Sequence, residues 1–303
     1  MSKKILCLRF TSEIEPRTKK PFAASDQKGI IKAYTKSCVL NVISMKFIDA
    51  HIHLSDEEYH GHVDEIVIEA KNANVVALVS NSMDLETSIG SLKLAEQYPN
   101  VIYAAFGIHP SNVKALTDSE LQQIMEWIPQ QKQNRALVAI GEIGLDNKYM
   151  DVWDKQLTVF NEMLHLAEKL QLPAIIHSRG TTAQIVDMLP SYDLKKVLLH
   201  FFSNPISVLA KAVENGYFIT EGCPTVYSEG IRDVVKRVPL TNLLTETDGP
   251  VRFFKPPFNG ERTTPAFIPT TVKAIAEIKK IDDADVADQI IRNFETFFGA
   301  KVN

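Results

Sequence analysis

The 303-residue chain has no apolar run approaching the roughly 18 residues of a membrane-spanning helix. Its first residues, MSKKILCLRF, contain only a short apolar stretch with no small-residue cleavage site after it, which makes a poor signal peptide. The three cysteines, Cys7, Cys38 and Cys223, lie far apart and form no CxxC pair. The small number and wide spacing of the cysteines argue against a disulfide framework or a zinc–thiolate site and fit a reducing compartment. We therefore expect a cytoplasmic protein without membrane contact.

A glycine-rich phosphate loop is also missing after the first strand-like segment, where an open doubly wound sheet would more often carry one. The chain instead repeats short Val- and Ile-rich runs, each followed by a segment with the apolar spacing of a helix. The eight runs cover residues 46–54, 75–80, 101–110, 136–146, 173–179, 196–203, 217–222 and 243–248. Eight strand–helix units in about 259 residues match a closed barrel of ~250 residues. We predict an α/β fold, a single (β/α)8 TIM barrel, with the doubly wound sheet as the alternative.

Charge is unevenly distributed along the chain. Residues 1–44 carry nine Lys and Arg against three Asp and Glu, whereas residues 45–303 carry 24 against 34. We predict that residues 1–44 form a flexible basic N-terminal extension and that residues 45–303 form the barrel domain. The extension is interpreted as a loose tail or the product of an upstream start codon. A basic arm for nucleic acid or a targeting segment is the alternative.

Titratable side chains stand at the ends of six of the eight runs, after the apolar residues. They are His51, His53, His109, Glu142, His177, His200 and Asp248. Active sites of barrels lie at the C-terminal ends of the strands, so these residues should converge on one mouth. A single strand histidine is usually a satisfied core residue. Burying the whole set without a cation would need a costly hydrogen-bond network, so a metal site is the simpler interpretation.

Two His-x-His triplets could hold the metal. In a strand, residues i and i+2 face the same side, so His51 and His53 would form a chelating pair. His60 and His62 follow the strand in an acidic segment, where the intervening glycine indicates a turn. On a helix, residues two apart would diverge. We therefore assign the metal to the first triplet.

The sequence resembles the TatD-type metal-dependent hydrolases, which are DNases within the amidohydrolase superfamily of TIM barrels. The resemblance covers about Met45 to Ala300, and residues 1–44 match nothing in the family. Its motifs are FIDAHIHL (47–54), FGIHP (106–110), AIGEIGLD (139–146), LPAIIHSR (172–179), HFFSN (200–204), TETDGP (245–250), PAFIP (265–269) and NFETFFG (293–299). The resemblance implies a first metal on His51, His53, Glu142 and Asp248. It implies a second metal on Glu142, His177 and His200, with Glu142 bridging the pair.

Several positions depart from the family's pattern without losing an implied metal ligand. Gly180 stands where an acidic residue usually follows His-Ser-Arg, and Gly249 replaces the Ala of Glu-Thr-Asp-Ala-Pro. Phe201 and Asn204 replace the Cys and Gly of His-Cys-Phe-Ser-Gly, and residues 262–265 alter an Arg-x-Asn-x-Pro motif. These changes concern pocket walls and phosphate contacts. For the two divalent ions, imidazole-rich ligation favours Zn or Mn whereas the resemblance implies Mg, and all three stay open.

Two bridged cations suit phosphodiester hydrolysis, because they activate a water and stabilise the leaving oxygen. The resemblance implies a deoxyribonuclease, and we predict 3′–5′ exonuclease action on single-stranded DNA ends. Asp248 and Glu142 would be catalytic, with Asp248 taking the proton from the water. His109, which has no metal role in the family, and Arg179 would bind the substrate phosphate as cationic donors. The alternative for Arg179 is an ion pair with a nearby carboxylate.

The segment at residues 249–265 is rich in Pro and Gly. It interleaves Phe253, Phe254 and Phe258 with Arg252, Lys255 and Arg262. Aromatic faces beside cations suit the stacking of unpaired bases, and the alternative is a lid packed on the barrel. The acidic excess of the barrel domain makes it a poor binder of duplex DNA, where phosphate neutralisation dominates affinity. We therefore favour chain ends or short single strands as the DNA partner.

Two other functions stay open. One is hydrolysis of a small amide, lactone or phosphoester substrate, as elsewhere in the superfamily. Many of those members bridge their metals with a carbamylated lysine on strand four, so Glu142 at that place favours the TatD branch. The other is a non-catalytic, metal-stabilised module that binds nucleic acid, for which a closed site of four protein ligands would be typical.

Overall fold

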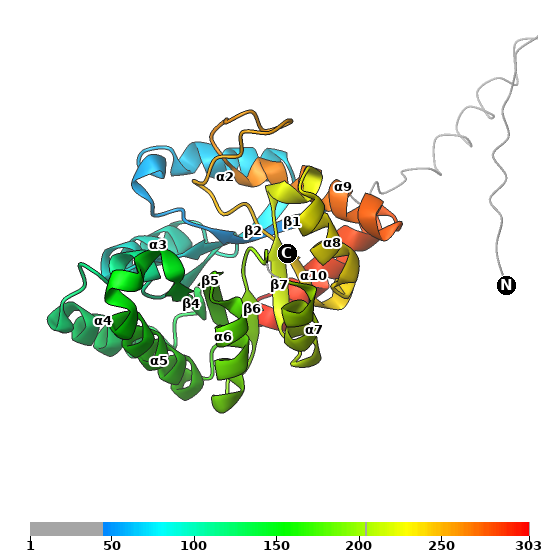
Figure 1. Ribbon diagram of the computed structural model, residues 1–303. Helices are drawn as coiled ribbons and strands as arrows, with labels where there is room; N and C mark the ends of the chain where they lie inside the picture. The colour runs from blue at the N-terminus through cyan, green and yellow to red at the C-terminus, as the bar shows by residue number, and fades with distance from the viewer. Residues whose placement is uncertain (1–44, 204, 303) are drawn as a thin grey trace, which may run out of the picture. The chain divides into compact units, whose positions relative to one another are not determined.

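Eight parallel strands form the centre of the protein (Figure 1). The computed structural model describes residues 45–203 and 205–302, so the predicted extension at residues 1–44 lies outside the described residues. The strands are β1 (Phe47–Ile52), β2 (Val75–Asn81), β3 (Ile102–Phe106), β4 (Leu137–Asp146), β5 (Ala174–Arg179), β6 (Val197–Leu199), β7 (Phe218–Glu221) and β8 (Leu243–Thr245). Each strand pairs in parallel with the next along the chain. β8 returns beside β1, where Thr245 Oγ1 donates to the Ile48 carbonyl, and the sheet forms a nearly closed TIM barrel.

Helices follow the strands and surround the barrel (Figure 1). They are α2 (Val63–Asn72), α3 (Leu85–Gln97), α4 (Asp118–Gln130), α5 (Trp153–Leu170), α6 (Thr182–Met188), α7 (Ile206–Glu214), α8 (Glu229–Arg237), α9 (Ile268–Lys279) and α10 (Asp283–Phe298). All residues of β1 and β4 are buried, because the interior covers one face and helices cover the other. This burial explains the continuous apolar runs. Among the described residues, no helix combines the length and apolarity needed to cross a membrane.

Local signals define where several elements begin, end or approach one another. α4 begins at a capping box, in which Thr117 Oγ1 accepts from the Glu120 N–H and the Glu120 carboxylate accepts from the Thr117 N–H. α10 ends at Gly299, whose φ of 69° is the left-handed conformation that side chains disfavour. At Gly144, an added Cβ would lie 2.0 Å from the His177 carbonyl oxygen. This glycine therefore allows β4 and β5 to lie close enough to bring their polar ends together.

All eight predicted runs contain a strand, which confirms the predicted barrel. Three strands end three or four residues before their runs end. β3 ends at Phe106, and Pro110 begins a 3-10 turn whose N-cap is His109. β6 ends one residue before His200, and β8 ends three residues before Asp248. These three polar side chains therefore lie in strand–helix loops, where a barrel presents its functional groups.

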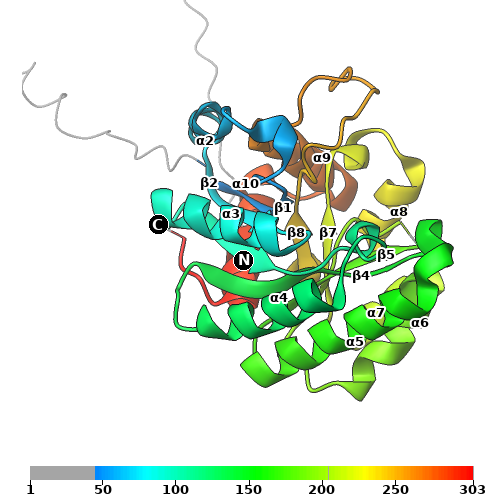
Figure 2. The same ribbon diagram turned by 90° about the vertical axis from the view of Figure 1, so that its left-hand side faces the viewer.

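The long loop between β8 and α9 is drawn in orange in Figure 2. Phe253 and Phe258 are buried in this loop and pack with Cys223, a free thiol, and with the partly buried Tyr227. Phe254 is 77% exposed. The lid interpretation is therefore right for two of the three phenylalanines, and their burial rules them out as stacking surfaces for bases.

Candidate metal centre

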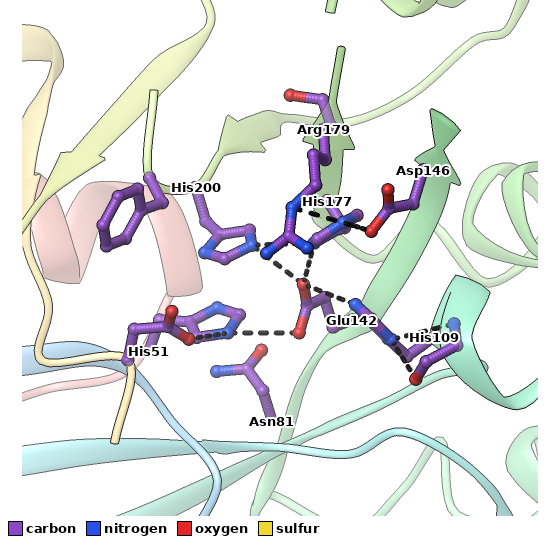
Figure 3. Close-up of polar contacts among 12 residues, drawn as sticks. His51, Asn81, His109, Glu142, Asp146, His177, Arg179 and His200 are labelled. Carbon is purple, nitrogen blue, oxygen red and sulfur yellow. Dashed lines mark hydrogen bonds and ion pairs between the residues drawn. The ribbon is translucent and has the colours of Figure 1, made fainter. Parts of the chain in front are cut away.

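Six predicted ligands meet at the C-terminal end of the barrel, although they come from five separate segments. Figure 3 shows four of them, His51, Glu142, His177 and His200. His51 and His53 come from the end of β1, Glu142 from β4, His177 from β5, His200 from the residue after β6, and Asp248 from the loop after β8. Asp248 has the most exposed side chain of the six, at 15%, whereas Glu142 is 2% exposed. The set thus forms a buried cluster whose most exposed side chains are those of Asp248 and His177.

Five distances among four atoms of this cluster match the separations of neighbouring ligands around one cation. His51 Nε2 and His53 Nε2 lie 3.2 Å apart, and each is 3.3 Å from Glu142 Oε2 and 3.6 Å from Asp248 Oδ1. Ligand bonds of about 2.0–2.1 Å in a tetrahedral site place neighbouring ligand atoms roughly 3.4 Å apart. The two imidazole nitrogens and each of the two carboxylate oxygens therefore have separations that fit a divalent cation.

A second group of nitrogens faces the other carboxylate oxygen of Glu142. His177 Nδ1 and His200 Nε2 lie 2.9 and 2.8 Å from Glu142 Oε1 and 3.4 Å from each other. His109 Nε2 lies 3.6 Å from the same oxygen. Glu142 therefore stands between two groups of donors and presents one oxygen to each, which is the arrangement a bridging carboxylate would need.

Partners behind the imidazoles fix which ring nitrogen faces the cluster. His53 Nδ1 is 3.1 Å from the Asn81 carbonyl, so its Nε2 is directed inward. His177 Nε2 is 3.1 Å from Asp146 Oδ2, which leaves Nδ1 for the cluster. His200 Nδ1 lies 3.5 Å from Glu246 Oε2, an ion-pair distance beyond good hydrogen-bond geometry. Carbonyl and carboxylate partners of this kind orient histidine ligands in metal sites and raise their basicity.

Without a cation, the cluster holds protons in its place. Burial opposes the charged form of every group, but the carboxylates outweigh it and raise the pKa of His53 to about 10. Glu142 and Glu246 likewise raise the pKa of His200 well above its ordinary value. In return, the surrounding imidazoles hold the pKa of Glu142 well below its usual range despite its burial. The site thus combines ionised carboxylates with the cationic imidazoles of His53 and His200, whereas burial lowers the pKa of His51. A divalent cation would replace the protons on the cationic imidazoles.

His109 differs from the predicted cationic donor. Burial lowers its pKa to about 3, so the imidazole is neutral and the predicted positive charge is wrong. Its Nδ1 accepts from the Ser111 N–H at 3.1 Å, which leaves the ring proton on Nε2, the nitrogen that faces Glu142. His109 can therefore donate a hydrogen bond into the cluster without carrying a charge.

Arg179 stands at the rim of the cluster (Figure 3). Its side chain is 60% exposed, and its Nε lies 3.8 Å from Asp146 Oδ2. The carboxylate pairing that we gave as the alternative is therefore present, but it is long and leaves most of the guanidinium in solvent. The pairing orients the side chain without occupying all of its donors.

The second triplet lies apart from the cluster. His60 and His62 are exposed, and His62 Nδ1 pairs with Glu65 at 2.9 Å on the surface. Neither belongs to a candidate metal-binding group among the residues that the structure describes. The geometry thus agrees with the preference for His51 and His53.

Sequence reasoning missed two carboxylates that support the cluster. Asp146 holds His177 and is the last residue of the run 136–146, so the rule that selected the other strand ends would have found it. Glu246 lies within the run 243–248, two residues before Asp248, and no sequence signal singled it out. It is fully buried, as is Glu221 at the end of β7, whose pKa burial raises well above its ordinary value. Only the fold shows that Glu246 lies beside His200.

Comparison with known proteins gives a family match over most of the chain. The model of the TatD related DNase family matches residues 48–299. The metal-dependent hydrolase YabD of Bacillus subtilis is 31% identical over 260 residues, which cover 82% of this chain and 98% of that protein. The 3′-5′ ssDNA/RNA exonuclease TatD of Erwinia amylovora is 28% identical over 263 residues, covering 83% and 99%. The crystal structure of the TatD homologue YjjV from Escherichia coli superposes with a TM-score of 0.78 at 29% identity, covering 84% and 98%.

Proposed function

Because the chain belongs to the TatD-related DNase family, whose members are metal-dependent hydrolases acting on ester bonds, we propose that it hydrolyses DNA phosphodiesters with two divalent cations. It removes nucleotides one at a time from the 3′ ends of single strands. The position of Glu142 carries this proposal, because each of its two oxygens faces a separate group of imidazoles. When bound, two cations would supply a Lewis acid for the phosphate oxygens and would lower the pKa of the attacking water.

Asp248 is the residue best placed to take the proton from the attacking water. Its hydrogen bond to His53 outweighs burial and lowers its pKa, so the carboxylate is ionised and able to accept a proton. It is also the most solvent-exposed member of the cluster, on the side from which water and substrate would enter. A general base must lie within hydrogen-bond reach of the proton that it abstracts, so Asp248 would act on a water held beside it at the metal centre.

His109 and Arg179 bind and orient the substrate phosphate. Neutral His109 donates from Nε2 toward the buried side of the cluster, where negative charge develops during displacement. Arg179 offers its exposed guanidinium from the rim and supplies the positive charge that His109 lacks. Asp146 orients both His177 and Arg179, so it connects metal binding with phosphate binding.

Surface charge supports action on strand ends. The barrel domain carries 34 Asp and Glu against 24 Lys and Arg, which disfavours the non-specific phosphate contacts that hold long duplexes. Nearby cations on the lid are largely paired, since Arg252 binds Glu58 at 3.1 Å and Arg262 lies 3.6 Å from Glu65. These pairings partly neutralise two cations of the lid that could otherwise contact a long strand.

The test is a digestion time course on single-stranded DNA labelled at its 5′ end. Chelator-stripped full-length protein is refilled with Zn, Mn or Mg singly and compared with Asp248→Asn and with the control His62→Gln from the exposed triplet. We expect a ladder that shortens one nucleotide at a time with wild type and His62→Gln and is absent with Asp248→Asn. Intact DNA under every ion, with metal bound, would refute the proposal and favour a small-molecule hydrolase.

A further inference from the structure

A cavity of about 460 Å³ lies between the β6–α7 loop and α8, and the residue after a candidate metal ligand forms part of its wall. Its walls include Phe201, Tyr227, Pro224, Ile231 and Lys255. Phe201 directly follows His200, and consecutive Cα atoms are 3.80 Å apart, so the wall begins one residue from a candidate metal ligand. This volume and an apolar lining with few polar groups are typical of small-molecule sites. A larger cavity of about 590 Å³, between α2 and the lid, has none of the candidate ligands or their chain neighbours in its walls.

The backbone at Phe201 is held in an unusual conformation. Its φ is 46°, a left-handed value that bulky residues rarely adopt, and its N–H donates to Thr220 Oγ1 at 3.3 Å. Such residues concentrate at ligand-binding positions, because the surrounding structure must compensate for the strain. The conformation allows His200 to face the metal centre while the next side chain lines the cavity.

The opposite wall combines an aromatic face with a cation. Lys255 Nζ lies 5.2 Å from the centroid of the Tyr227 ring, and Tyr227 is only partly buried. The carboxylate in the lining, Asp233, is already paired with Arg237 at 3.1 Å. The cavity therefore offers two aromatic side chains and one cation, with its acidic group compensated. These are the features by which proteins hold single-stranded nucleic acid without reading its sequence, because every base has a face that can stack.

We propose that this cavity binds the nucleobase of the 3′-terminal nucleotide, stacked on Tyr227 and Phe201, while its phosphate lies at the metal centre. The inference rests on the proposed nuclease function and adds to it the subsite that holds the leaving nucleotide. An exonuclease that removes any terminal nucleotide needs such a sequence-tolerant subsite. Base stacking is worth about 1–3 kcal/mol per base, which corresponds to roughly 5- to 100-fold in affinity.

The test compares two 5′-labelled single strands that differ only in the last nucleotide, which carries thymine or has no base. Removal of that nucleotide is measured as kcat/KM for wild type, Tyr227→Ala, Gly230→Trp and the matched control Gly230→Ala. Gly230 lies in α8 at the cavity wall, and an added Cβ would meet no atom within 4 Å, so tryptophan is chosen there to place a bulky side chain at the cavity. We expect wild type and Gly230→Ala to prefer the thymine end by about 5- to 100-fold.

Tyr227→Ala and Gly230→Trp should both lose this preference. Gly230→Trp should still remove the abasic nucleotide at the wild-type rate, which also shows that this variant is folded. The base subsite would be overturned, while the nuclease function stands, if Gly230→Trp kept the preference for the thymine end. It would also be overturned if the variants lowered kcat/KM equally for both substrates. If wild type cleaves neither strand with metal bound, the nuclease function itself fails and the subsite fails with it.

Discussion

Metal loading of this protein should release protons. In the metal-free cluster, hydrogen bonds to Asp248 and Glu142 overcome burial and raise the pKa of His53 to about 10. At 1.36 kcal/mol per pKa unit, removing this proton at pH 7 costs about 4 kcal/mol, or roughly three powers of ten in apparent metal affinity. The carboxylates also raise the pKa of His177 and His200, so the total release should be at least one proton per protein. Apparent affinity should rise about tenfold per pH unit for each proton displaced.

Isothermal titration calorimetry of the stripped, full-length protein with Zn²⁺ or Mn²⁺ measures this release directly. The titration is repeated at pH 7 in two buffers of different ionisation enthalpy. The difference between the two binding heats gives the number of protons released when the metal binds. His53→Gln should release about one proton fewer and bind metal more weakly. His60→Gln is the matched control, because this exposed histidine of the other triplet lies outside the cluster. Zero proton release at pH 7, or affinity that does not change with pH, would refute the reasoning.

The same pKa shift links folding stability to pH. The pKa of His53 rises from about 6.5 in the unfolded chain to about 10 in the folded one, so the protonated imidazole stabilises the fold. This contribution is fully present below pH 6.5 and is lost as the pH rises through 10. The stripped protein should therefore have a lower Tm at pH 10 than at pH 7, and added cation should stabilise it more at the higher pH. A Tm of the stripped protein that rises across this range would contradict the assignment.

Asp248→Asn should lower kcat by about 10²–10⁴-fold while some metal binding persists, because His51 and His53 still chelate. Metal content and turnover are measured on the same protein. An unchanged kcat would disprove the role of Asp248 as the general base. Asp146→Asn should lower metal affinity or activity by about 10–100-fold, since His177 loses the carboxylate that contacts its Nε2. Wild-type metal affinity together with wild-type activity would contradict the positioning role of Asp146. Gly144→Ala should destabilise the fold by about 1–3 kcal/mol in urea unfolding, because its Cβ would meet a carbonyl at 2.0 Å. An equally stable variant would show that β4 and β5 can separate there.

The barrel was predictable because its signals are local. Each buried strand is a short apolar run, each helix has its own periodicity, and the number of units matched the size of a closed barrel. The metal cluster was predictable for a related reason. In a parallel barrel all strands end at one mouth, so His51 and Asp248, almost 200 residues apart, could be assigned to one place from their positions in their runs.

The sequence-based predictions that were wrong concern side chains whose behaviour depends on burial. His109 was expected to be cationic, yet its surroundings make it neutral, and no sequence pattern reports how deeply a loop histidine lies. Phe253, Phe254 and Phe258 look alike in the sequence. In the structure Phe253 and Phe258 are buried within the lid, whereas Phe254 is exposed. Exposure depends on which distant segments cover a side chain, and here Cys223 and its neighbours provide the cover.

The sequence by itself determined the barrel, its polar mouth and the choice of His51 and His53 over the exposed triplet, because all three depend on period and position within a strand. Tertiary structure alone decided which carboxylate stands behind which imidazole, and which oxygen of Glu142 faces which group. It also formed the cavity beside Phe201 from loops far apart in the chain. Distances of about 3 Å between side chains on different strands are set by packing and by charge in a buried environment, which no local pattern encodes.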